Sequence, residues 1–271
     1  MKKLFPYLLL LTFLLCSCNQ NNVWNQQAEK KTELQLYSKV PEDFIPRKLT
    51  IISAGDSLTE GVGDSTEKGG YLPYLKTRLE SEKGINKVEF INYGVKGNRT
   101  TQLLKRLESE EIKNNLAKAD MIILTIGGND IMKVVTDNLS NLQMSVFESE
   151  KGKYITHLTR ILHYISQQNP HASVVLIGLY NPFEEWFSGI GELQKVVTDW
   201  NAAGRNVTAG FPNAYFVPIE DLFANSGEKL LYKDHFHPND KGYELIAERM
   251  FDQLEMNALP ALAKTAKKEE K

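Results

Sequence analysis

Ser57, Asp234 and His237 are residues whose types can carry out nucleophilic and acid–base chemistry together, although they lie far apart in the chain. Ser57 stands in the stretch AGDSLTEG at positions 54–61, directly after the apolar run 49–53. A serine hydroxyl is a weak nucleophile until a base takes its proton. His237 can be that base, since imidazole titrates near neutrality, and Asp234 three residues earlier can hold its tautomer.

The elements that must position these residues can be predicted from hydrophobic periodicity. Five short apolar runs predict buried strands at 49–53, 88–92, 121–125, 173–178 and 215–218. Between them, apolar residues recur at helical spacing over 71–82, 103–119, 154–167, 193–207 and 243–254. Such alternation indicates a parallel sheet covered on both faces. We therefore predict an α/β fold, a three-layer α/β/α sandwich with a five-stranded parallel sheet.

Four polar motifs follow the ends of predicted strands. GDSL at 55–58 follows the first strand, NYGVKGN at 92–98 the second, GGND at 127–130 the third and DHFHP at 234–238 the fifth. In such folds the ligand crevice lies outside the carboxyl ends of the strands. All four motifs therefore fall on one edge of the sheet, where a site is expected.

These motifs, in this order and over nearly the whole folded region, resemble the blocks of the SGNH hydrolases, the GDSL family of lipases and esterases. The resemblance rests on GDSL, on the glycine of VKGN at 95–98, on GGND and on DHFH at 234–237. It implies a flavodoxin-like fold and a carboxylic ester hydrolase that works through an acyl-serine intermediate. The implied triad is Ser57, Asp234 and His237. This chemistry needs no metal and no cofactor.

The same resemblance assigns an oxyanion hole. Its donors are the backbone N–H of Ser57, the backbone N–H of Gly97 and the side-chain amide of Asn129. A glycine lets a backbone amide approach a reacting carbon closely. Because Thr59 stands two residues after Ser57, the chain lacks G-x-S-x-G, which argues against the nucleophile elbow of the α/β-hydrolases.

Several residues near the motifs have structural alternatives. Asp56 is expected to bond loop amides rather than to activate the serine. His235 is expected to be a surface or packing neighbour, and it is the alternative base. Asn129 has the alternative of closing a turn. The remaining histidines are expected to be structural: His157, His163 and His171.

Apolar side chains near the same edge are candidates for an acyl-chain pocket. Phe183, Trp186 and Phe187 follow the fourth strand, and Ile131 follows the third. Either segment could line a pocket, form a lid or simply pack against neighbouring helices. The glycines at 61, 63, 69 and 70 indicate a mobile loop beside the serine.

The favoured substrates are carboxylic esters such as lysophospholipids or other short acyl esters. A carbohydrate O-deacetylase acting on cell-wall polymer is an alternative within the same fold. A metallophosphoesterase with Asp56, Asn129, His235 and His237 as ligands is weakened, because no metal-binding histidine follows the aspartate. A lipoprotein that only binds is the non-enzymatic alternative, and it has no need of the full triad and oxyanion set.

The N-terminus has the pattern of a bacterial lipoprotein signal. Lys2 and Lys3 are basic, residues 4–15 form an apolar run too short to span a bilayer, and a small residue precedes Cys18. We predict a signal peptide at 1–17, a lipid-anchored polar tether at 18–48, a hydrolase domain at 49–260 and a polar tail at 261–271. A lipid on Cys18 would hold the protein at the extracytoplasmic face of a membrane. A plain secretory signal is the alternative.

Composition excludes some classes of function. The 271 residues are 42% hydrophobic and 24% charged, and a folded region of roughly 210 residues suits one domain. Both cysteines lie in the targeting segment, so the mature domain would have no disulfide and no cysteine nucleophile. Without Lys2 and Lys3 the 32 basic residues become 30 against 34 acidic ones, a net charge of −4. With no basic cluster, nothing indicates nucleic-acid binding. The oligomeric state is not predicted.

Overall fold

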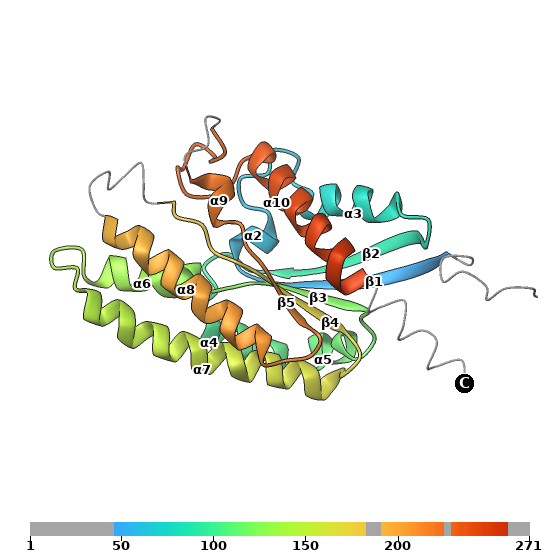
Figure 1. Cartoon of the computed structure of the whole chain (residues 1–271), viewed down its shortest axis with the longest axis horizontal. Coiled ribbons are helices and arrows are strands. Elements are labelled where there is room, and N and C mark those ends of the chain that lie inside the picture. Colours follow the sequence, from blue (N-terminus) through green and yellow to red (C-terminus); the bar gives the residue numbers. More distant parts are fainter. Residues whose placement is uncertain (1–45, 183–190, 225–228, 260–271) are drawn as a thin grey trace, which may run out of the picture. The chain divides into compact units, whose positions relative to one another are not determined.

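The computed structural model describes residues 46–182, 191–224 and 229–259. Its centre is a sheet of five parallel strands in the order β2-β1-β3-β4-β5 (Figure 1). The strands are β1 (Arg47–Gly55), β2 (Ile85–Gly94), β3 (Met121–Thr125), β4 (Ser173–Ile177) and β5 (Ala214–Val217). The five predicted strands are confirmed, and the strand order is the flavodoxin-like one.

Helices connect the strands. They are α2 (Ser57–Glu60), α3 (Leu72–Glu80), α4 (Thr100–Leu107), α5 (Glu110–Leu116), α6 (Gly128–Asp137), α7 (Met144–Gln168), α8 (Gly191–Ala209), α9 (Glu220–Phe223) and α10 (Asp240–Gln253), with a π-helical turn η1 (Leu254–Ala258) after α10. The helices predicted at 71–82, 193–207 and 243–254 correspond to α3, α8 and α10. The one predicted at 154–167 is the second part of a longer helix, α7.

The single helix predicted over 103–119 is wrong, because this segment forms two helices. α4 ends at Leu107, and Ser109 adopts an extended backbone conformation with φ −64° and ψ 143°. Ser109 then serves as the residue before α5, whose first turn begins with Glu110 and Glu111. Serine before a helix and acidic residues in its first turn both favour a new N-terminus. The apolar periodicity continued across this break and concealed it.

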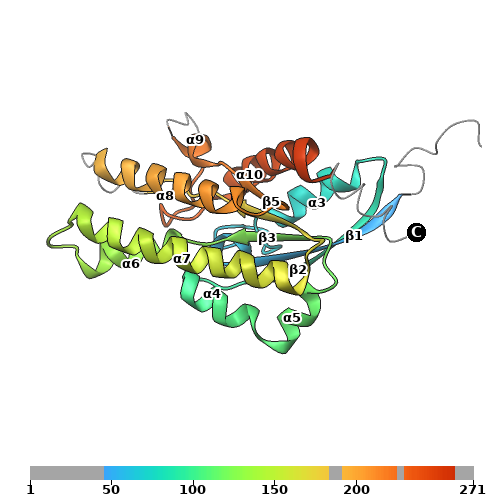
Figure 2. The same ribbon diagram turned by 60° about the horizontal axis from the view of Figure 1, so that its bottom comes forward.

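Each face of the sheet has its own set of covering helices (Figures 1 and 2). Alternate residues of β3 point to opposite faces, so that Ile122 and Leu124 pack in one core while Met121 and Ile123 pack in the other. Helices α4 to α8 contribute to the first core, and α3 and α10 to the second. The predicted three-layer sandwich is therefore confirmed. Within the described ranges, no helix is both long and apolar enough to cross a membrane.

The winding of the chain reverses at β1. The connection from β1 to β2 runs through α3 on one face, and the connection from β2 to β3 runs through α4 and α5 on the other. In doubly wound sheets this reversal opens a crevice outside the carboxyl ends of the two strands concerned, here β1 and β3. The GDSL and GGND motifs follow these two strand ends.

Candidate active site

Ser57 is the first residue of α2, in a tight turn wedged against β3. Gly55 ends β1 where no side chain fits, because a Cβ there would lie 2.0 Å from the carbonyl oxygen of Thr125. Asp56 caps α2, since its Oδ1 accepts a hydrogen bond from the backbone N–H of Leu58 at 3.1 Å. The glycine and the aspartate of the motif thus shape the turn that presents the serine.

The fold brings Ser57, His237 and Asp234 into one hydrogen-bonded chain. His237 Nε2 lies 2.9 Å from Ser57 Oγ, and His237 Nδ1 lies 2.7 Å from Asp234 Oδ2. A carboxylate only accepts, so the ring carries its proton on Nδ1 and leaves Nε2 free to accept from the serine hydroxyl. Ser57 and His237 are 3% and 6% exposed, so the hydrogen bond between them is shielded from bulk water.

One short loop carries both Asp234 and His237. Asp234 Oδ1 accepts from the backbone N–H groups of Phe236 and His237, each at 3.0 Å, while Oδ2 accepts from the ring. Burial alone would raise the pKa of Asp234, but these hydrogen bonds outweigh it and hold the pKa below the ordinary 3.8. His235 sits at the loop's corner with φ 53° and is exposed. His237, and not His235, therefore reaches the serine.

Asp56 lies at the end of a chain of buried side-chain hydrogen bonds behind the turn. Its Oδ1 accepts from Thr125 Oγ1 at 2.9 Å. The chain continues through the hydroxyls of Thr125, Thr59, Tyr71 and Ser53, with successive oxygen distances of 2.8, 3.0 and 2.5 Å. Burial raises the pKa of Asp56 to about 7 despite these donors. The expectation that Asp56 organises the loop agrees with these contacts.

Asn129, in the first turn of α6, faces the same crevice. Its Nδ2 donates to the backbone carbonyl oxygen of Asn98 at 3.0 Å. Because a carbonyl can only accept, this contact fixes which end of the amide is the NH₂ group. One N–H is used by Asn98, and the second remains to meet a ligand in the crevice. Asn129 therefore makes a structural hydrogen bond, and the same bond holds its side-chain amide in place beside the crevice.

Gly97 lies next to Asn98 and has φ +79°. An added Cβ would meet nothing within 4 Å, so space in the free protein does not require glycine here. The left-handed backbone conformation does, since residues with a Cβ rarely adopt it. Within the free protein the need for glycine at this position is therefore conformational, and the close approach of its amide to a reacting carbon stays a prediction.

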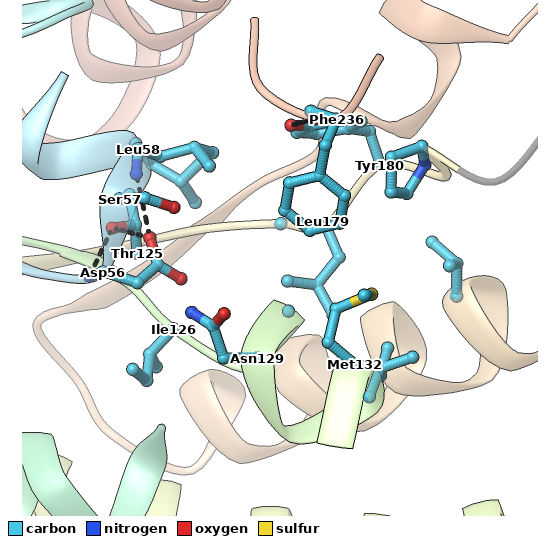
Figure 3. A pocket seen from close by; sticks show the side chains of 16 residues that line it. Asp56, Ser57, Leu58, Thr125, Ile126, Asn129, Met132, Leu179, Tyr180 and Phe236 are labelled. Carbon is cyan, nitrogen blue, oxygen red and sulfur yellow. Dashed lines mark hydrogen bonds between the residues drawn. The ribbon is translucent and has the colours of Figure 1, made fainter. Parts of the chain in front are cut away.

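An apolar cavity opens beside Ser57 (Figure 3). Its volume is about 560 Å³ when the open solvent at its mouth is included. Figure 3 shows Ser57, Asp56 and Asn129 on one side and Met132, Leu179 and Phe236 facing them. Much of its apolar lining comes from α6, from the segment after β4 and from α8: Ile131, Met132, Leu179, Tyr180, Pro182 and Val197. Ile131, predicted from sequence, lines the cavity together with Met132.

Other predicted residues have different outcomes. Phe183, Trp186 and Phe187 lie outside the described residues, as does Cys18 with the segments predicted at 1–17 and 261–271. In the loop expected to be mobile, the carboxylate of Asp64 accepts hydrogen bonds from the backbone N–H groups of Thr66, Lys68 and Gly70. Sequence reasoning missed Leu179 and Tyr180, which only the position after β4 could have indicated.

The described residues contain no group of three or more His, Cys, Asp or Glu side chains arranged to hold a metal ion. In particular, His237 is engaged with Ser57 and Asp234. His235, offered as a fellow ligand in the metallophosphoesterase alternative, is exposed at the corner of its loop.

Comparisons with known proteins agree with the geometry. A family model, the GDSL-like lipase/acylhydrolase family, matches residues 53–245. The chain is 34% identical over 260 residues to the uncharacterized protein YpmR of Bacillus subtilis (strain 168), covering 95% of this chain and 98% of that protein. It is 24% identical over 221 residues to the spore germination lipase LipC of Bacillus licheniformis, covering 74% and 94%.

Among solved structures, the lipase Lip_vut3 from a goat rumen metagenome is similar with a TM-score of 0.68 and 25% identity. The match covers 74% of this chain and 95% of Lip_vut3. The region matched by the family model, 53–245, contains all four motifs that follow the strand ends.

Proposed function

This chain belongs to the GDSL-like lipase/acylhydrolase family and is a carboxylic ester hydrolase, and we propose that Ser57, His237 and Asp234 are its catalytic triad. The observation that carries the proposal is the hydrogen-bonded chain from Ser57 Oγ to His237 Nε2 at 2.9 Å and from His237 Nδ1 to Asp234 at 2.7 Å. Each group has the partner that its role requires before substrate binds.

In the proposed mechanism, Ser57 Oγ attacks the ester carbonyl carbon while its proton passes to His237 Nε2. The imidazolium that forms is stabilised by the carboxylate of Asp234, which does not itself become protonated. His237 then gives the proton to the leaving alcohol as the carbon–oxygen bond breaks, and an acyl-serine remains. A water molecule, activated by His237 in the same way, releases the acid and restores the serine.

The oxyanion of the tetrahedral intermediate needs donors that are in place beforehand. We propose the backbone N–H of Ser57, the backbone N–H of Gly97 and the second N–H of Asn129. The first is at the start of α2, where amides have no acceptor within the helix. The Asn129 amide is already oriented by Asn98. Each of these donors is expected to be worth about 10²–10³ in turnover.

The apolar cavity favours an ester with an apolar acyl chain as the substrate. Its walls from α6 and from the segment after β4 are side chains such as Met132, Leu179 and Val197, which suit methylene groups rather than sugar hydroxyls. Lysophospholipids and medium-chain acyl esters are therefore the proposed substrates. A preference for acetate esters would instead favour the alternative function, carbohydrate O-deacetylation.

The first experiment compares hydrolysis of p-nitrophenyl butyrate by the wild-type protein, Ser57→Ala and the surface control Ser81→Ala. Ser81 directly follows α3, and its hydroxyl donates a hydrogen bond to the backbone carbonyl oxygen of Arg78 in that helix. We expect Ser57→Ala to lose at least about 10³-fold in kcat and Ser81→Ala to retain full activity. Undiminished hydrolysis by Ser57→Ala would remove the proposed mechanism.

The second experiment measures kcat/KM for the acetate, butyrate and octanoate esters of p-nitrophenol. Each buried methylene contributes about 0.8 kcal/mol, so butyrate should exceed acetate by about tenfold if the cavity holds the chain. In Met132→Trp, which fills the cavity, octanoate should lose about tenfold or more while acetate stays within threefold. Leu139→Trp is the matched control, since Leu139 is 64% exposed just after α6. Acetate preferred over both longer esters would favour the deacetylase.

The protein is further proposed to be anchored at the extracytoplasmic face of a membrane through a lipid on Cys18. The support is the signal-like segment 1–17 and the small residue before Cys18. Metabolic labelling with radioactive palmitate in a bacterial host should label the wild-type protein and Cys16→Ala, and should not label Cys18→Ala. Label retained in Cys18→Ala would contradict the anchor without affecting the proposed triad.

A further inference from the structure

A buried carboxylate joins the starts of two helices beside the crevice. Asp130, in the first turn of α6, is 3% exposed. Its Oδ2 accepts from the backbone N–H of Thr100 at 3.0 Å, and its Oδ1 accepts from Thr100 Oγ1 at 2.7 Å. Thr100 is the first residue of α4 and is fully buried. The side chain and the main chain of Thr100 are therefore both bound by one carboxylate.

The two joined segments are those that carry the proposed oxyanion donors outside the serine turn. Thr100 comes three residues after Gly97, and Asp130 directly follows Asn129. The hydrogen bond from Asn129 Nδ2 to the Asn98 carbonyl connects the same two segments a second time. The spacing of the Gly97 and Asn129 donors thus depends on contacts between the starts of α4 and α6.

A carboxylate suits this place for a physical reason. The N-termini of α4 and α6 both carry partial positive charge, and an acidic group near a helix start is stabilised by it. The N–H of Thr100 also has no acceptor within α4, because it is the first residue of that helix. Without Asp130 this buried N–H would be unpaired, and an unpaired buried donor is destabilising.

His157 on α7 extends the link. The hydroxyl hydrogen of Thr100 is given to Asp130, so its oxygen can only accept from His157 Nδ1, which lies 3.2 Å away. His157 is therefore the donor, through Nδ1, and it gives the Thr100 hydroxyl a second partner besides the carboxylate. Asp130 and His157 together therefore hold the Thr100 hydroxyl in one rotamer.

We propose that Asp130 is a positioning residue that sets the separation of the Gly97 and Asn129 donors through Thr100. This inference rests on the proposed function, because it concerns the oxyanion hole of that mechanism. An error in spacing of a few tenths of an ångström would weaken donors that must meet a developing charge, while leaving the acyl-chain cavity intact. The effect should therefore fall on kcat and not on KM.

The test uses Asp130→Ala, the conservative Asp130→Asn, and Thr100→Val, which keeps the backbone bond and removes the hydroxyl. We expect Asp130→Ala to lose about 10²-fold in kcat for p-nitrophenyl butyrate with KM within threefold. Thr100→Val should lose about three- to tenfold. Asp130→Asn should recover most of the activity, since its oxygen can accept from the Thr100 N–H and its NH₂ can donate to the hydroxyl oxygen. The Thr100 hydroxyl can then donate to His157 Nδ1 in the other tautomer of that ring.

A second readout is binding of 1-butaneboronic acid. Ser57 Oγ bonds to boron, the serine proton passes to His237, and the resulting tetrahedral anion resembles the intermediate. Its inhibition constant should rise in Asp130→Ala and Thr100→Val by the same factors as kcat falls. Asp120→Ala is the matched control. Asp120 also accepts a hydrogen bond from a backbone N–H, that of Thr50 at 2.7 Å, but it directly precedes β3 and so lies at the N-terminal ends of the strands, away from the proposed site. It should lower the melting temperature without changing kcat or the inhibition constant.

The outcomes separate this inference from the proposed function. If Ser57→Ala remains active, the mechanism itself fails. If Ser57→Ala is inactive but Asp130→Ala and Thr100→Val only lower the melting temperature, as Asp120→Ala does, then Asp130 is merely structural and the inference is overturned. Should Asp130→Ala fail to fold, unchanged kcat and boronate binding in Thr100→Val would overturn it equally.

Discussion

The turn at 55–58 and the loop at 234–237 each place a carboxyl group near Ser57, in opposite surroundings. Asp56 adjoins the serine, is 4% exposed, and burial raises its pKa to about 7. The Asp234 side chain is 38% exposed, and its pKa is held below 3.8 by hydrogen bonds that outweigh its burial. Both carboxyl groups accept hydrogen bonds, so the difference lies in their exposure to solvent. Asp234, which in the proposed mechanism must stay charged beside an imidazolium, keeps contact with solvent, whereas Asp56, which shapes a turn, is buried.

The two groups also act oppositely on stability as pH changes. For Asp56 the folded-state pKa lies above the ordinary value, so its favourable contribution is complete below pH 3.8 and is lost as pH rises through about 7. For Asp234 the folded-state pKa lies below 3.8, so its contribution is present above pH 3.8 and is lost as pH falls through the lowered pKa. Each prediction below changes one residue of the Asp56 turn and its hydrogen-bond partners or of the loop that carries Asp234.

The largest effect is expected for Asp234→Asn. The amide would favour the wrong tautomer of His237 and could not balance its positive charge, so kcat should fall about 10³–10⁴-fold. Hydrolysis of p-nitrophenyl butyrate measures this, with circular dichroism to check the fold. A loss of less than tenfold would show that His237 works without this carboxylate.

Asp56→Asn is expected to alter stability rather than catalysis. The amide oxygen can still accept from Leu58 and Thr125, so kcat should stay within tenfold. The wild-type protein should lose up to roughly 4 kcal/mol of unfolding free energy between pH 4 and pH 8 relative to the variant, since each pH unit between 3.8 and 7 is worth about 1.4 kcal/mol. Urea denaturation across this range measures the difference. Parallel pH profiles for the two proteins would contradict the raised pKa.

Thr125→Val removes the hydroxyl that donates to Asp56 at 2.9 Å and leaves the backbone contacts in place. The unfolding free energy should fall by about 1–3 kcal/mol, with the larger loss at pH 8, where Asp56 is ionised and needs the donor most. Thr136→Val, at an exposed position of α6, is the control and should change it by less than about 0.5 kcal/mol. An equal loss at pH 5 and pH 8 would mean that the hydroxyl serves packing alone.

The smallest effect is expected for His235→Asn. Asparagine tolerates the positive φ of 53° found here and His235 does not reach the serine, so kcat should stay within twofold. His235→Val should instead lower the melting temperature, because a β-branched residue is strained at that φ. Loss of activity in His235→Asn would reopen its role as the base.

Much of the fold could be predicted because it follows from local patterns. Runs such as 121–125 alternate with amphipathic helices, and this order alone indicates a parallel sheet whose strand ends share one edge. The break at Ser109 was missed because a cap can interrupt a helix without interrupting apolar periodicity. Leu179 and Tyr180 were missed because their place in the cavity depends on where β4 ends relative to α6.

By itself, the sequence determined the order of the elements and the residue types at the strand ends, since periodicity and turn chemistry act over a few positions. It also determined that Asp234 and His237 share one loop, because they are three residues apart. Only the tertiary structure decided that Asp56 is buried with a raised pKa while Asp234 stays half exposed, and that Asp130 binds Thr100. Burial and its electrostatic consequences depend on which distant segments pack together, and that information is not local to any motif.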